Sequence, residues 1–182
     1  FKEIHTYQLG EILQTKSNGL IDEFISYAKQ NGGCLKISYQ DEHLKSIMGM
    51  MITIQTVWHI VKQIGSNFDI EFKVEAYRDD KGNANKICTN MPSSEVRDKW
   101  LTNFTNAWID DLKYDQNIEG HLLPVVSVSK RTLTHWRVLS ITCGNKKLSI
   151  YPDGGFINEW NIARQPNGER FEVETITYDT KI

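Results

Sequence analysis

The chain has 182 residues, of which 24% are charged and 40% hydrophobic, and its formal net charge is −2. These values are typical of one globular domain and exclude a disordered chain. The balanced charge argues against a broad nucleic-acid-binding face, although a local basic patch remains compatible with it. The sequence contains no apolar run of about 18 residues, which argues against a transmembrane helix.

Three scattered cysteines, Cys34, Cys88 and Cys143, fit neither a disulfide framework nor a zinc site. They favour a reducing compartment, so we expect a cytoplasmic protein. The chain opens at Phe1 without a signal peptide, which suggests a domain taken from a larger parent protein.

Helical and strand patterns alternate along the first half of the chain. Residues 1–16 are weakly patterned and predict a lead-in segment or a short strand, which places a single domain at 17–182. Helical spacing predicts helices over 20–28, from Asp41 or Glu42 to near Gly65, and over 92–112. Alternating apolar residues predict strands over 34–39 and 70–76.

The second half favours strands separated by turns. Strands are predicted over 122–128, 133–141, 146–151 and 171–178, with turns over 143–145 and 152–155. The glycine pair Gly154-Gly155 is interpreted as a simple turn that opens no helix. The order of elements predicts an α/β fold, a mixed sheet flanked by helices with an antiparallel C-terminal meander.

No P-loop, dinucleotide-binding, nucleophile-elbow, zinc-protease or EF-hand motif is present. The five histidines lack metal-ligand spacing, so we expect no metal and no cofactor.

One locally basic segment stands out in this acidic chain. His135 and Arg137 are two apart on a predicted strand and therefore share a face, where imidazole and guanidinium suit a phosphate group. The segment 130–147 has no Asp or Glu, and its candidate anion-binding residues are Lys130, Arg131, His135, Arg137, Lys146 and Lys147. The alternative is a solvated strand edge, where Lys and Arg discourage pairing with another strand.

At these residues the sequence resembles the phospholipase-D-like domain at the C-terminus of MIT-domain (microtubule interacting and transport) proteins. The likeness rests on three segments and on the order of elements over about residues 18–178. The segments are Thr134-His135-Trp136-Arg137-Val138, Lys147-Leu148-Ser149-Ile150 through Gly154-Gly155-Phe156-Ile157, and Phe171-Glu172-Val173-Glu174-Thr175-Ile176-Thr177. The resemblance implies a phospholipase-D-like fold.

The resemblance also has functional implications. Active phospholipase-D enzymes use a His-x-Lys motif followed by Asp, usually in two copies. Here Arg137 replaces the Lys, Thr142 stands where the Asp would fall, and one motif is present. The resemblance therefore implies a non-catalytic binding and assembly domain, peripheral to a membrane, that holds an acidic phospholipid headgroup or a similar phosphate-bearing ligand.

Two other functions remain open from the sequence. One is a phosphodiesterase or nuclease of phospholipase-D type, with His135 as the candidate catalytic residue. The other is a protein-interaction module within a larger multidomain protein.

The resemblance further implies a homodimer, because a single His motif per chain is usually accompanied by pairing. Met50 falls off the main apolar stripe of its predicted helix and follows Gly49, which would let a second copy approach closely. The alternative is that all the large apolar residues share one core.

Overall fold

The structure is a computed structural model that describes residues 4–41, 44, 47–65, 68–77, 125–129, 137–152, 154–164 and 176–180. The helix expected over 92–112 lies outside the described residues, as do parts of the strands expected over 133–141 and 171–178.

Helices and strands follow one another along the described chain in a mixed α/β order. The helical elements are η1 (Thr6–Gln8), α1 (Leu9–Lys16), α2 (Leu20–Asn31), α3 (Ile47–Ile64) and α5 (Phe156–Ala163). The strands are β1 (Gly33–Asp41), β2 (Phe68–Tyr77), β3 (Val125–Ser129), β4 (Val138–Cys143), β5 (Lys146–Ile150) and β6 (Ile176–Thr180).

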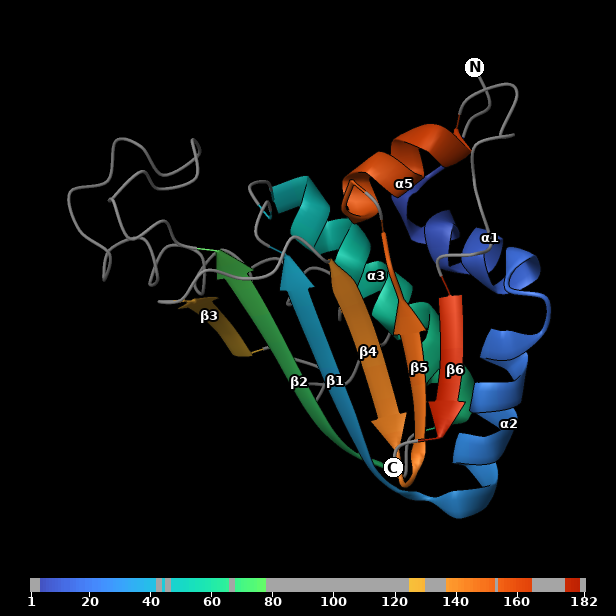
Figure 1. Cartoon of the computed structure of the whole chain (residues 1–182). Coiled ribbons are helices and arrows are strands. Elements are labelled where there is room, and N and C mark those ends of the chain that lie inside the picture. The colour runs from blue at the N-terminus through green and yellow to red at the C-terminus, as the bar shows by residue number, and fades with distance from the viewer. Residues whose placement is uncertain are drawn as a thin grey trace.

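The strands form one six-stranded mixed sheet in the order β3-β2-β1-β4-β5-β6 (Figure 1). β1, β2 and β3 are parallel, and α3 is the crossover from β1 to β2. β4, β5 and β6 continue the sheet as antiparallel neighbours. The predicted mixed α/β sheet with antiparallel C-terminal strands is therefore confirmed, whereas a specific phospholipase-D-like fold is not.

Several elements differ from the sequence-based predictions. Residues 6–16 are helical, where a lead-in or short strand was expected. α3 begins at Ile47 and not near Asp41, which ends β1. The Gly154-Gly155 turn leads directly into α5, where no helix was expected.

The described helices cover one face of the sheet (Figure 1). Alternation in β1 follows from this arrangement, because successive side chains point to opposite faces. Leu35, Ile37 and Tyr39 are buried toward the helices, whereas Lys36 and Ser38 are exposed on the opposite face.

α3 is the centre of the helical layer and contacts α1, α2 and α5. Its side chains are buried on several sides, and the apolar ones with the least exposure are Met50, Ile52, Ile54, Val57, Ile60, Val61 and Ile64. α1 adds Leu9 and Leu13 to the same core. Within the described ranges, no helix is long and apolar enough to cross a membrane.

Candidate functional site

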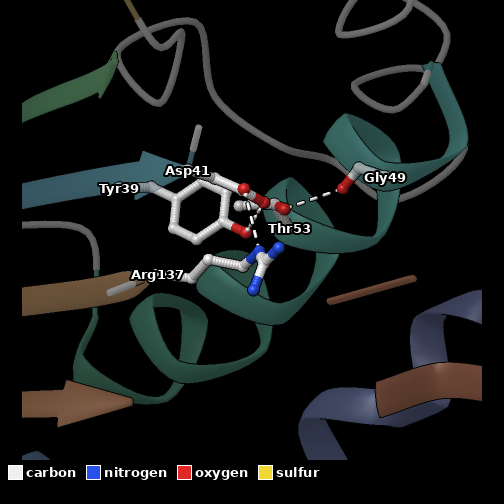
Figure 2. A network of polar contacts seen from close by, with 5 residues as sticks. All are labelled: Tyr39, Asp41, Gly49, Thr53 and Arg137. Carbon is white, nitrogen blue, oxygen red and sulfur yellow. Dashed lines mark hydrogen bonds and ion pairs between the residues drawn. The ribbon is translucent and has the colours of Figure 1, made fainter. Parts of the chain in front are cut away.

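A buried carboxylate at the end of β1 is the centre of a polar network (Figure 2). The Tyr39 hydroxyl donates a hydrogen bond to Oδ2 of Asp41 at 2.7 Å, and Nε of Arg137 lies 3.1 Å from its Oδ1. The side chain of Asp41 is 4% exposed and that of Arg137 is 17% exposed. This arrangement is a buried ion pair with a third polar group attached.

Strand geometry explains how these residues meet. Tyr39 and Asp41 are two apart on β1, so both side chains point toward the helical layer. Gln40 pairs with Val138 in the antiparallel ladder of β1 and β4. The next residue on β1 is Asp41, and the residue before β4 is Arg137, so the register places the opposite charges across from each other.

The start of α5 closes this site from another direction. Gly155 has φ +84°, and a Cβ at this position would lie 3.0 Å from Oδ2 of Asp41. The next residue, Phe156, packs its ring against Tyr39 with centroids 5.2 Å apart. Two features favour glycine at position 155: its left-handed backbone conformation, and the close approach of the Asp41 carboxylate. We call Tyr39, Asp41, Arg137 and Gly155 the Asp41 clasp.

Electrostatics inside the clasp follow from burial. Desolvation, then the negative charge of Asp41 and the hydrogen bond to it, raise the pKa of Tyr39 well above its ordinary value. Arg137 and the backbone N–H of Phe156 lower this pKa by smaller amounts. Tyr39 is therefore a neutral donor at physiological pH.

The clasp is suited to holding the fold together. Both carboxylate oxygens of Asp41 accept hydrogen bonds from within the domain, and the nearby Thr53 hydroxyl of α3 donates to the carbonyl of Gly49 at 2.7 Å (Figure 2). The network joins the end of β1, the start of β4 and the start of α5. Across the described ranges, no group of three His, Cys, Asp or Glu side chains is arranged to hold a metal ion.

Three of the six predicted anion-site residues lie in the described structure, where Arg137 and Lys146 are far apart. Lys130, Arg131 and His135 lie outside the described residues. Lys146 pairs with Cys143 at the far end of the β4–β5 hairpin, about 20 Å from Arg137 at the strand rise per residue. The ammonium group of Lys146 lies 5.5 Å from the centre of the Tyr178 ring, and Lys147, the next residue on β5, is half-buried.

Sequence reasoning singled out Arg137 but missed its partners. Asp41 was interpreted as a helix start, although it continues the two-residue alternation of Leu35, Ile37 and Tyr39. That alternation was the available signal for an inward-facing carboxylate. Nothing local in the sequence connects Gly155 to residues more than a hundred positions earlier.

Residues 5–180 match the protein family described as DEAD/DEAH box helicase YjiV, C-terminal domain. No curated protein and no solved structure matches the chain.

The family match corrects the functional expectations drawn from the sequence. The expected relationship to the phospholipase-D-like MIT C-terminal domain is wrong, because the matching family is a helicase domain. The expected phospholipid-binding role is overturned with it. The match supports neither the phosphodiesterase alternative nor the protein-interaction module.

Proposed function

This chain belongs to the C-terminal domain family of the DEAD/DEAH box helicase YjiV, and on that premise we propose that it is an accessory domain of such a helicase, which helps the motor engage its nucleic-acid substrate. The observation that carries the proposal is the extent of the match, which spans 5–180 of the 182 residues.

The sequence supports an accessory role and not a motor role. A helicase of this class hydrolyses ATP, and NTP-hydrolysing motors of this type cradle the phosphates in a Gly-x-x-x-x-Gly-Lys-Ser/Thr loop. That motif does not occur in these 182 residues. ATP hydrolysis would then belong to another part of the helicase polypeptide.

The fold supports the same role. Leu9 of α1, Ile52 of α3 and Phe156 of α5 share one core with the sheet, and the Asp41 clasp ties the start of α5 to β1 and β4. A domain with its own core can present a fixed surface to a substrate while the motor moves.

The experiment compares an intact helicase that carries this domain with a form lacking residues 5–180. We expect ATP hydrolysis without nucleic acid to persist after deletion, whereas strand separation and the stimulation of ATP hydrolysis by nucleic acid decrease. The second variant is a helicase with Arg137→Met, which destabilises the domain without shortening the chain. We expect its strand separation and its stimulation by nucleic acid to decrease as well. The proposal is contradicted if the deletion form and the Arg137→Met helicase both separate strands as the intact helicase does.

A further inference from the structure

Two stacked pairs of flat side chains lie where the start of the described chain meets α5. The His5 and Tyr7 rings are parallel within 5°, with centroids 5.4 Å apart. The Arg164 guanidinium lies 4.6 Å from the centre of the Trp160 ring. The Trp160 indole donates a hydrogen bond to the carbonyl of Ile4, next to His5, at 3.1 Å. That bond brings the pairs together, and we call His5, Tyr7, Trp160 and Arg164 the aromatic corner.

The aromatic corner is partly accessible to solvent. Tyr7 is 45% exposed, and Tyr7 and Met48 are the exposed large hydrophobic side chains of the described chain. His5 is exposed, and Trp160 and Arg164 are half-buried. The corner therefore offers an exposed Tyr7 ring stacked on His5, and the Arg164 guanidinium over the Trp160 ring.

The aromatic corner is also held in place before any ligand arrives. The backbone N–H of His5 donates to Oε1 of Gln8 at 2.7 Å, and the N–H of Gln8 donates back to the carbonyl of His5 at 3.0 Å. Leu9, directly after this turn, is fully buried in the core. Figure 1 shows α1 and α5 together at one end of the molecule. A prearranged surface loses less conformational entropy on binding than a mobile one.

The chemistry of the corner matches unpaired nucleotides. Bases of single strands stack on aromatic rings and on guanidinium planes, and this stacking tolerates any sequence. Arg also attracts the phosphate backbone. Duplex binding usually needs a row of phosphate-neutralising cations, which the low net charge of this chain does not favour.

We propose that the aromatic corner is a binding site for a short stretch of single-stranded nucleic acid, with Tyr7 as the stacking surface and Arg164, held over the Trp160 ring, as the phosphate contact. This inference rests on the proposed function and assigns the substrate contact to named residues. A protein partner is the competing occupant, because Tyr, Trp and Arg also dominate protein interfaces.

The test measures binding of the 182-residue chain to a fluorescent oligothymidine of about ten nucleotides at about 50 mM salt, by fluorescence anisotropy. We expect Tyr7→Ala to weaken binding by about fivefold or more, and Tyr7→Phe to retain it, because the ring and not the hydroxyl stacks on a base. Arg164→Ala should weaken binding and reduce the salt dependence by about one phosphate contact.

Two exposed positions outside the corner provide matched controls. Met48→Ala removes exposed apolar area without removing a ring, and Lys29→Ala removes a cation from the last turn of α2. Both variants should bind the oligonucleotide as the unmodified chain does.

The proposal is overturned if the unmodified chain does not bind the oligonucleotide, or if Tyr7→Ala binds as tightly as the unmodified chain. A Tyr7→Ala helicase that loses strand separation although its oligonucleotide binding is unchanged would identify a protein contact instead. Loss of strand separation on domain deletion, with normal oligonucleotide binding by Tyr7→Ala, would leave the proposed function standing and remove this site.

Discussion

Asp41 is held in the core by hydrogen bonds from Tyr39 of β1 and from Arg137, the residue before β4. A buried carboxylate is costly unless it is paired and hydrogen-bonded. Tyr39 and Arg137 meet both conditions, at 2.7 and 3.1 Å. The sequence predicts that Arg137 binds an anion, but it does not identify Asp41 as the partner, because the two residues are 96 positions apart along the chain.

Removing the cation should destabilise the domain strongly. Arg137→Met removes the guanidinium that pairs with the buried Asp41 carboxylate, so we expect the free energy of unfolding to fall by about 3–5 kcal/mol. The double variant Asp41→Leu/Arg137→Met removes both charges and should recover at least about 1 kcal/mol of that loss. Urea denaturation measures both values.

An exposed ion pair provides the control for this cycle. Lys73 pairs with Glu71 on β2, where their side chains are 65% and 44% exposed. Lys73→Met should change the free energy of unfolding by no more than about 1 kcal/mol. Equal losses for the Arg137 and Lys73 variants would contradict the role assigned to the clasp.

We expect His59 to make the stability of the domain depend on pH. Its Nε2 lies 2.6 Å from Oε1 of Gln14 on α1, and Gln63 donates to the same oxygen at 2.9 Å. Burial, and to a smaller extent the Lys62 charge, lower the pKa of His59, while Glu11 on α1 raises it. Asp22 of α2 completes the network by accepting a hydrogen bond from Gln14.

The sign of the pH dependence follows from the lowered pKa of His59. As the pH falls, His59 takes up its proton in the unfolded chain before it does so in the folded one. The contribution of neutral His59 to the free energy of unfolding is therefore complete above about pH 6.5 and is lost below it. We expect the free energy of unfolding of the unmodified chain to fall more steeply than that of His59→Gln from neutral to mildly acidic pH. Parallel profiles for the two proteins would rule out His59 as the source.

At the scale of elements, α3 shows where periodicity is informative and where it fails. The sequence predicts its end near Gly65 correctly. The helix predicted over 20–28 and the strand predicted over 70–76 are confirmed and lie within Leu20–Asn31 and Phe68–Tyr77. Its buried positions do not form one stripe, because the helix lies between the sheet and other helices. Thr53 and Thr56 tolerate that burial by bonding to backbone carbonyls four residues earlier, both at 2.7 Å.

α5 is the element that local signals missed. Its sequence of eight residues follows a glycine pair that favours a turn, and short helices depend on tertiary packing more than on propensity. That packing is supplied by the buried Phe156 ring against Tyr39, and by contacts with α1 and α3.

The close contact of α1 with α3 predicts that a Gly→Ala substitution in α1 lowers the stability of the domain, the opposite of the usual effect. A Cβ at Gly10 would lie 2.5 Å from the Cβ of His59. Gly→Ala inside a helix ordinarily stabilises by about 1 kcal/mol, but here overpacking should lower the free energy of unfolding by about 1–3 kcal/mol.

Ser26→Ala on the exposed face of α2 is the control for Gly10→Ala and should stay within about 0.5 kcal/mol of the unmodified chain. Thermal denaturation compares the three proteins. A stabilised Gly10→Ala variant would mean that α1 does not approach α3 this closely.

At the scale of the whole molecule, composition indicates a globular domain and the order of predicted elements indicates an α/β fold, but neither identifies a helicase domain. Of the residues that suggested phosphate binding, Arg137 and Lys146 lie at opposite ends of the β4–β5 hairpin and three others lie outside the described residues, and the family match overturns the phospholipid-binding role. An accessory function of this kind depends on the parent helicase. It therefore cannot be predicted from a balanced composition that contains no catalytic motif.

The homodimer stays a prediction, although the resemblance that implied it is wrong and its second ground, an accessible Met50, is weakened. Met50 is 4% exposed and belongs to the core, whereas Met48 is 42% exposed. Light scattering at micromolar concentration measures the association. The dimer prediction requires a mass near twice 21.0 kDa that reductant does not change, and a mass near 21.0 kDa throughout would reject it.

The claim that this domain touches nucleic acid inside a working helicase is tested most directly by site-specific cross-linking. A photoreactive aromatic amino acid replaces Tyr7 in one intact helicase and Lys29 in another, and each is irradiated with a single-stranded substrate. We expect a protein–nucleic acid cross-link from position 7 and none from position 29. No cross-link from position 7, in a helicase that still separates strands, would contradict it.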